Sequence, residues 1–476
     1  MSDASVLAPK LVGDFTPAAE ADWRALVAKT LGEAPFASLE KTTVEGLAIE
    51  PLYAQATAPA ITPRALDPDR HWEIRTLVAH PDIARANAEV LRDLEGAAAS
   101  VIVRIDPAGK TGVAVGSAQG LAKVLEGVIL EFAPIALDAG FLGPQAADWL
   151  GAAAKASPSA LLRFNLDPLS AFAEAGASPG AIEAHLISAA TVGARLADTY
   201  PQAQLFLASG RVVHEAGGGE AEEIAFAAAS AVAYAKALVR AGLPMAEAFA
   251  RITLGLAADA DYFLTIAKLR AARAVWARIA TACGAGPVTR IEARSSRRML
   301  TAKDAWTNMI RLAAAGFGAA VGGADAVMLG NFTDALGLPT AFARRQSRNA
   351  QLVLMEEAHI GRVADPAAGS GYVEALTDAI AREAWARFQA IEAEGGIVAA
   401  LASGRIAAEV AAAVAARSTP KIIGVTAFPP AKEEPVEVEI AAARAVQAPS
   451  TRLPGPDSSC PPLTPIRLSE PFEADR

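Results

Sequence analysis

Cysteine is scarce in this chain of 476 residues, which contains only Cys283 and Cys460. The two lie far apart, and neither belongs to a C-x-x-C motif or to a Cys/His cluster. Disulfide frameworks and structural zinc sites both need several such residues at short spacing. The sequence therefore predicts two free thiols and a fold that is held by its core.

Long apolar runs are also absent, although 53% of the residues are hydrophobic. None approaches the roughly 20 residues needed to cross a bilayer. Residues 1–15 lack the basic and apolar pattern of a secretory leader and the Arg-rich pattern of an organellar one. We therefore expect a soluble, cytoplasmic protein with no membrane partner.

An excess of positive charge is missing as well, since the net charge is -9. Nucleic-acid-binding proteins need a basic surface to displace counterions from phosphate. The sequence therefore predicts small molecules or proteins as partners, and no nucleic acid.

Several catalytic motifs have no match. His214 and Glu215 resemble the start of a zinc-binding H-E-x-x-H, but Gly218 occupies the place of the second histidine. No G-x-S-x-G, P-loop or convincing G-x-G-x-x-G motif occurs. We expect no metal site, no nucleotide site and no hydrolase.

The pattern between residues 97 and 416 alternates short β-branched runs with Ala-rich stretches at helical spacing. This alternation is typical of β/α units on a parallel sheet. Eight units predict a (β/α)8 TIM barrel. The predicted strands are Ser100–Ile105, Pro134–Asp138, Leu161–Asn165, Gln204–Ala208, Ile252–Ala257, Arg290–Arg294, Ala326–Leu329 and Arg362–Asp365.

Two helices are the clearest. Asp261–Ala280 repeats apolar residues every three or four positions, and Tyr372–Gly395 ends at a glycine pair, which is a common helix stop. Branched residues in the strands, namely Val101, Val103, Ile252 and Leu254, favour a barrel axis filled by side chains.

The chain divides into three predicted segments. Residues 1–96 form an N-terminal arm and lead-in, with a helix at 18–31 and an extended stretch at 45–53 that could wrap a neighbour. Residues 97–416 form the barrel. Residues 417–476 form a tail that holds 11 of the 30 prolines and so cannot continue an ordinary core.

Catalytic residues of a barrel lie where its strands end, at the C-terminal face. Polar residues at the predicted strand ends are therefore candidates, although Asp106-Pro107 and Asp365-Pro366 also suit a structural role in turns. The candidates are Asp106, Asp138, Asn165, His214, Glu215, Glu292 and Asp365.

Long ordered segments resemble the barrel of methylmalonyl-CoA mutase. They are DYFLTIAKLRAARAVWARI from Asp261, SSRRMLTAKDAWTNMIR from Ser295, and ALGLPTAFARRQSRNAQLVLMEEAH from Ala335. The resemblance implies a family that interconverts methylmalonyl-CoA and succinyl-CoA with adenosylcobalamin, and that threads coenzyme A along the barrel axis.

The resemblance also exposes departures at the site. Active members read S-G-Y-H after the strand that corresponds to Gln204–Ala208, and their His donates a hydrogen bond to the thioester carbonyl. Here Ser209 and Gly210 are kept, but Arg211 and Val212 replace the Tyr and the His. Because valine cannot donate a hydrogen bond, the stabilisation of developing charge is lost.

Three further departures agree. The R-G-x-Y-x-T segment that contacts the acyl-CoA has no counterpart between Tyr53 and Arg75. The His-bearing end of another strand reads Val327–Gly330, and no D-x-H-x-x-G cobalamin signature occurs. In the family's small subunits a segment like 463–473 leads into a degenerate cobalamin-like domain, whereas this sequence ends at Arg476.

The resemblance therefore implies a non-catalytic small (β) subunit that pairs with an active large subunit as a heterodimer. No catalytic, cofactor-binding or metal residue is expected in this chain, and adenosylcobalamin would be bound by the partner. Two alternatives stay open: a repurposed acyl-CoA-binding barrel that uses Arg211 and Glu215, and a split mutase chain that borrows a cobalamin domain.

Overall fold

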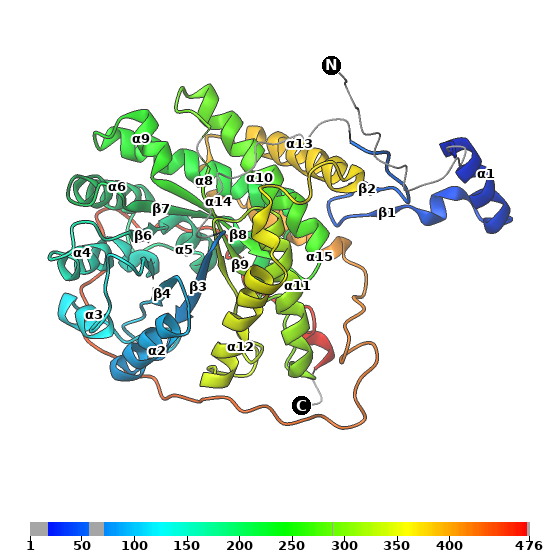
Figure 1. Cartoon of the computed structure of the whole chain (residues 1–476). Coiled ribbons are helices and arrows are strands. Elements are labelled where there is room, and N and C mark those ends of the chain that lie inside the picture. Colours follow the sequence, from blue (N-terminus) through cyan, green and yellow to red (C-terminus); the bar gives the residue numbers. More distant parts are fainter. Residues whose placement is uncertain (1–17, 57–70, 288, 474–476) are drawn as a thin grey trace, which may run out of the picture.

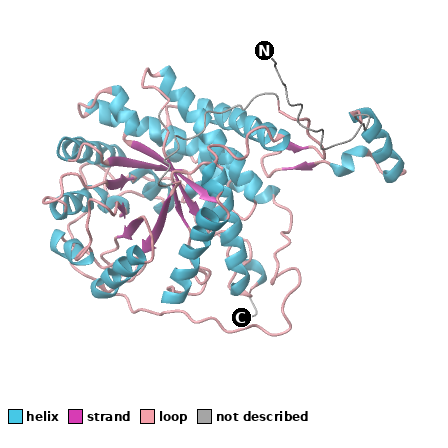
Figure 2. Ribbon diagram, in the orientation of Figure 1, coloured by secondary structure: helices cyan, strands magenta, loops and turns pink. Residues whose placement is uncertain are grey.

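The computed structural model describes residues 18–56, 71–287 and 289–473, and within them the chain forms a closed barrel of eight parallel strands. Figures 1 and 2 show the strands converging at the centre with helices around them. The predicted (β/α)8 barrel is confirmed. Its strands are β3 (Glu73–Val78), β4 (Ser100–Arg104), β5 (Ile135–Asp138), β6 (Leu162–Leu166), β7 (Gln204–Ser209), β8 (Ile252–Ala258), β9 (Ile291–Ser295) and β10 (Ala326–Met328).

Helices cover the outside of the barrel and bury one face each against it. The clearest predicted helices are found as α10, which is capped by Asp261, and α13, which stops before Gly395 and Gly396. The surrounding helices are α2 (Ile83–Glu95), α3 (Ala118–Val124), α4 (Gly143–Ala153), α5 (Pro168–Ala175), α6 (Ile182–Thr199), α7 (Arg211–Glu215), α8 (Glu220–Arg240), α9 (Met245–Ala250), α10 (Tyr262–Ala282), α11 (Asn308–Val321), α12 (Ala341–Leu352), α13 (Gly371–Ala393), α14 (Ile397–Ala402) and α15 (Arg405–Ala416). Within the described ranges, every helix is too short or too polar to cross a lipid bilayer.

One strand was predicted in the wrong place. Residues 362–365 form no strand: a 3₁₀ turn at Ile360–Arg362 leads into an irregular segment, and Val363 is exposed. The eighth strand is instead β3, which pairs with β10 and β4 and closes the barrel. The barrel therefore begins at Glu73, inside the segment predicted as a lead-in, and not at residue 97.

The barrel axis is crossed by a ladder of alternating charges. Arg163 of β6 pairs with Glu73 of β3, and Arg75 of β3 pairs with both Glu73 and Glu292 of β9. Since β3 and β6 are not neighbours in the barrel, these side chains can meet only through its interior. Positive and negative side chains therefore alternate across the N-terminal half of the barrel axis.

The ladder continues upward through Arg294 of β9. Its guanidinium lies 2.5 Å from Glu292 Oε1 and 3.0 Å from Asp138 Oδ2 of β5, and Asp138 also accepts hydrogen bonds from Arg104 of β4 at 3.2 Å. Burial alone would raise the pKa of Glu73, but Arg75 and Arg163 overcome it and lower that pKa to about 2. The positive charges of the two arginines thus keep the buried carboxylate ionised.

The expected apolar filling of the axis by Val101, Val103, Ile252 and Leu254 is wrong. These four residues belong to the core between the strands and the helices, whereas Ile102 and Ala136 form a separate small apolar cluster with Met328. The alternation of side chains along a strand explains the difference. On the inward face of β4, the hydroxyl of Ser100 accepts a hydrogen bond from Arg75 Nε at 2.8 Å.

The arm projects from the side of the barrel (Figure 1). It contains α1 (Glu20–Leu31), none of whose residues is buried, and the short antiparallel pair β1 (Lys41–Thr42) and β2 (Ala48–Ile49). Glu45 anchors it, because its carboxylate accepts hydrogen bonds from the backbone N–H groups of Ala221 and Glu222 at the start of α8.

The tail encircles the C-terminal rim of the barrel, where Figure 1 draws it in orange to red. Its backbone bonds the loops in the order of the strands: Glu439 with Leu338 after β10, Val446 with Pro107 after β4, Cys460 with Gly176 after β6, Ile466 with Glu215 after β7, and Leu468 with Arg298 after β9. The tail thus lies on the barrel surface over most of its length.

Close approach of the tail explains one glycine. Gly180 has a φ of +94°, and a Cβ built on it would lie 2.1 Å from the carbonyl oxygen of Leu453. Any other residue would therefore be strained and would push the tail away.

The two cysteines are free thiols. Burial raises the pKa of the Cys460 thiol to about 11, while Cys283 is exposed.

Neutralising Glu292 should destabilise the barrel strongly. Glu292→Gln leaves the buried guanidinium groups of Arg75 and Arg294 short of one counter-charge, and breaking a buried ion pair typically costs about 3–5 kcal/mol. Urea denaturation followed by far-UV circular dichroism should show this loss. The matched control is Asp378→Asn, which removes an exposed pair with Arg382; a loss no larger than in this control would contradict the role of the ladder.

Candidate functional site at the C-terminal end of the barrel

A cavity of about 520 Å³ lies at the C-terminal end of the barrel. Its wall is formed by residues that end or follow β4, β5, β6, β7 and β9, and by Thr451 and Pro465 of the tail. This is the end at which TIM-barrel enzymes place their active sites. The cavity is therefore the candidate functional site.

Four of the seven predicted site residues line this cavity, namely Asp106, Asp138, Asn165 and Glu215. The other three do not. Glu292 lies deeper, in the ladder, and Asp365 pairs with Arg270 of α10 outside the barrel interior. His214 is fully buried behind the wall.

Asp106 has the structural role that its Asp-Pro sequence suggested. Its carboxylate accepts hydrogen bonds from the backbone N–H groups of Ala108, Lys110 and Thr111, each at 2.9 Å. These three donors hold the turn after β4, and they lower the pKa of Asp106 against the effect of burial. The carboxylate is committed to the turn.

Arg211 and Val212 begin the short helix α7, directly after β7. Both line the cavity. Among the described residues, no hydrogen bond or ion pair reaches the guanidinium of Arg211, and its buried Nε has no partner. Burial, and then repulsion from Arg294, lower the pKa of Arg211 to about 10. This arginine is a half-buried cation without a direct counter-ion.

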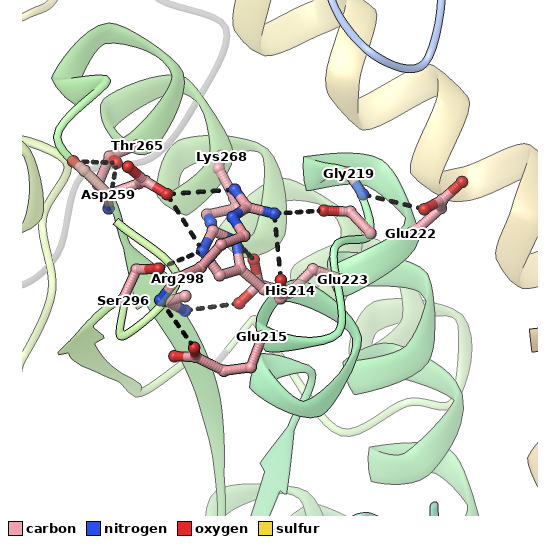
Figure 3. Close-up of polar contacts among 12 residues, drawn as sticks. His214, Glu215, Gly219, Glu222, Glu223, Asp259, Thr265, Lys268, Ser296 and Arg298 are labelled. Carbon is pink, nitrogen blue, oxygen red and sulfur yellow. Dashed lines mark hydrogen bonds and ion pairs between the residues drawn. The ribbon is translucent and has the colours of Figure 1, made fainter. Parts of the chain in front are cut away.

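His214 lies at the centre of a buried polar network, which Figure 3 shows. Its Nε2 is 2.8 Å from Ser296 Oγ and 3.3 Å from Asp259 Oδ2, and its Nδ1 is 3.4 Å from Glu223 Oε2. Lys268 of α10 donates to Glu223 at 2.6 Å. The network joins α7, α8, α10 and the loops after β8 and β9.

The electrostatics of the network favour its charged carboxylates. Burial would raise the pKa of Glu223, but Lys268 and the hydrogen bond from His214 lower it to about 2. Asp259 is likewise held well below its usual pKa, against burial, by His214 and by Arg298, which lies 3.1 Å away.

Ser296, His214 and Glu223 follow one another in the order of a nucleophile, a base and an orienting acid. Ser296 and His214 are nevertheless fully buried and line none of the cavities described here. A substrate could not reach the hydroxyl. Their contacts fix the position of α7 behind Arg211, and this role is structural.

Asp167 is a site residue that the sequence reasoning missed. It accepts a hydrogen bond from the hydroxyl of Tyr234 at 2.6 Å and lines the cavity. Burial raises its pKa to about 7 in spite of this bond. A signal existed, because Asp167-Pro168 repeats after β6 the Asp-Pro pattern that marked Asp106-Pro107 after β4.

Comparison with known proteins bears on these features. The family model described as methylmalonyl-CoA mutase matches residues 69–452. The chain belongs to the methylmalonyl-CoA mutase family. The resemblance stated from the sequence is therefore confirmed. The cavity lies at the C-terminal end of a barrel that belongs to a cobalamin-dependent family.

Similar proteins carry the name of one particular subunit. The chain is 39% identical to a methylmalonyl-CoA mutase small subunit of Streptomyces virginiae, over 91% of this chain and 74% of that protein. It is 38% identical to a probable small subunit of Mycobacterium tuberculosis, over 77% of this chain and 62% of that protein. It is 35% identical to the small subunit of Propionibacterium freudenreichii subsp. shermanii, over 81% and 64% respectively. The chain thus spans less than two thirds of the last two relatives.

The described residues do not fit a cobalt-ligating cofactor at this face. No histidine lines the cavity, and in the described ranges no three His, Cys, Asp or Glu residues converge in a way that could hold a metal ion. The Nε2 of His214, the nearest histidine in sequence to Arg211, is hydrogen-bonded to Ser296, and its Nδ1 lies 3.4 Å from the carboxylate of Glu223.

The raised pKa of Asp167 predicts a pH-dependent contribution to stability. The pKa of this carboxyl is about 4 in the unfolded chain and about 7 in the folded chain. The folded state therefore binds the proton more tightly, and the stability that Asp167 contributes is lost as the pH rises through 7. The free energy of unfolding of Asp167→Asn should rise relative to the unaltered chain between pH 4 and 7.

Urea denaturation at a series of pH values measures this difference. Asn can still accept the hydrogen bond from Tyr234, so the change isolates the proton. Asp378→Asn, which makes the same change on the exposed face of α13, serves as the control for the substitution itself. A flat difference for Asp167→Asn would mean that this carboxyl titrates normally.

Proposed function

We propose that this chain is the non-catalytic small subunit of a heterodimeric methylmalonyl-CoA mutase, and that it stabilises an active large subunit. The relatives named as small subunits support the assignment. The observation that carries the non-catalytic role is the ladder of ion pairs along the barrel axis, which occupies the path that coenzyme A takes in active members of the family.

The cavity wall supports the same proposal. Val212 stands where the resemblance places the histidine that assists the thioester carbonyl, and its side chain packs in the hydrophobic core. Arg211 stands where the family has tyrosine. Valine offers no hydrogen-bond donor to a developing oxyanion, and removing such a donor commonly costs about 10²–10³ in rate.

The cofactor belongs to the partner in this proposal. Adenosylcobalamin supplies the radical chemistry of the family. Because no histidine lines the cavity at the C-terminal face, we assign its binding to the large subunit. In this chain two carboxylates of the same face are already engaged, Asp138 by Arg104 and Glu215 by backbone N–H groups.

The arm is the surface that we assign to the large subunit. It extends beyond the barrel and exposes large apolar side chains, among them Leu26 at 65% and Leu52 at 44%. Apolar groups grouped on a projecting segment are typical of protein interfaces. Tyr53, which packs against Tyr372 of α13 at 5.3 Å, ties this surface to the barrel.

Association should depend on the arm. The tagged chain is expected to co-purify one-to-one with a methylmalonyl-CoA mutase large subunit, and turnover of the complex should reside in the large subunit. Leu26→Glu combined with Leu52→Asp should reduce the yield of complex at least tenfold, because charges would have to be buried at the interface. Co-purification followed by a mutase assay of the complex and of each chain measures both effects.

The matched control is Phe132→Asp, since Phe132 is 78% exposed and lies in the loop that follows α3. Figure 1 shows α3 on the opposite side of the barrel from the arm. The Phe132→Asp change should leave association unchanged. Turnover by this chain alone would contradict the proposal and favour a split mutase, whereas failure to associate would favour the repurposed acyl-CoA-binding barrel.

A further inference from the structure

The cavity at the C-terminal end of the barrel contains a cation that its surroundings leave unpaired. Asp138 is engaged by Arg104 and Arg294, and the carboxylate of Glu215 accepts hydrogen bonds from the backbone N–H groups of Arg297 and Arg298. The acids nearest to Arg211 are therefore committed elsewhere. A half-buried guanidinium whose buried Nε has no partner is costly in surroundings of low dielectric constant.

A second unsatisfied donor faces the same cavity. Asn165 is only 7% exposed and lines the cavity, yet its Nδ2 has no hydrogen-bond partner among the described residues. Its backbone also has a φ of +47°, a conformation that few residue types adopt readily. Buried donors without acceptors are rare in native proteins and call for an explanation.

Both groups are donors, so the missing partner is an acceptor. The planar guanidinium of arginine matches the two oxygens of a carboxylate, and the amide of Asn165 can donate to one of them. Asp167, whose pKa is about 7, carries a proton for part of the time at neutral pH and so repels an anion less than an ordinary carboxylate does.

The charges and the volume of the cavity restrict the class of ligand further. Of the cations of this wall that are buried or half-buried, only Arg211 has no ion-pair partner among the described residues, while Asp138 and Glu215 would repel a second negative charge on the ligand. A volume of 520 Å³ falls in the lower half of the range of small-molecule sites. We propose that this cavity binds a small monocarboxylate, held by Arg211 and Asn165.

The tail is part of this site. Thr451 and Pro465 contribute to the wall, and backbone hydrogen bonds from Leu453 to Pro179 and from Ile466 to Glu215 hold the tail next to them. The tail thus completes one side of the cavity. This inference goes beyond the proposed function and does not depend on it, since it concerns the isolated chain.

Ligand-observed saturation-transfer NMR with propionate tests the site on the full chain. Propionate should show saturation transfer, and propionamide, its neutral counterpart of the same shape, should show none. Arg211→Met should weaken propionate binding at least tenfold. Arg382→Met makes the same change on the exposed face of α13, and it should bind propionate like the unaltered chain.

Asn165→Asp provides a second variant, because aspartate tolerates the positive φ and would place a carboxylate in the cavity. It should abolish propionate binding while the far-UV circular dichroism spectrum stays unchanged. Equal binding of propionate by Arg211→Met, or equal binding of propionamide, would overturn the proposal. Displacement of propionate by an equal concentration of inorganic phosphate would overturn the assignment to monocarboxylates.

These outcomes are separate from those that test the proposed function. A chain that binds propionate but fails to associate with a large subunit would retain this site and lose the proposed function. A chain that associates but shows no Arg211-dependent binding would do the reverse.

Discussion

The alternation of charge along the barrel axis is the constraint on which the rest of the structure depends. Arg163, Glu73, Arg75, Glu292 and Arg294 succeed one another across three strands, and the series ends at Asp138 and Arg104. The charges from Arg163 to Arg294 are buried or nearly so, and each is tolerable only because its neighbours have the opposite sign. Strands β3, β6, β9, β5 and β4 are thereby held in one mutual register.

The ladder crosses the axis and leaves the sites that can bind a partner at the two ends of the barrel or outside it. The accessible features are the cavity above the strands, a second cavity of about 970 Å³ at the N-terminal end whose wall includes Glu73, Arg75 and Arg163, the tail and the projecting arm. The network around His214 supports the same arrangement. It ties α7 to α8 and α10, and so fixes the backbone that carries Arg211.

Much of this organisation could be predicted from the sequence. Seven of the barrel strands, the two clearest helices and the tail are marked by apolar periodicity and by proline. Strand β3 was missed because Glu73 and Arg75 interrupt its apolar pattern, for a reason that only the ladder supplies. A strand was wrongly predicted at residues 362–365 because Val363 and Asp365 have the sequence pattern of a strand end. In the structure Val363 is exposed and Asp365 pairs with Arg270.

The candidate site was predictable only in outline. Residue types at strand ends located Asp138, Asn165 and Glu215 on one wall, since parallel strands end at one face. The sequence could not reveal that Asp138 is neutralised by arginines 34 and 156 positions away, or that Arg211 is left unpaired. Such facts depend on contacts between distant segments and on burial, and local sequence patterns encode neither.

Calorimetric titration of the purified chain with methylmalonyl-CoA tests most directly whether the ladder closes the barrel. With the axis occupied by paired charges, coenzyme A cannot be threaded through it, and no saturable binding is expected. One-to-one binding of methylmalonyl-CoA to the isolated chain would contradict a closed axis and would return the barrel to the acyl-CoA-binding members of its family.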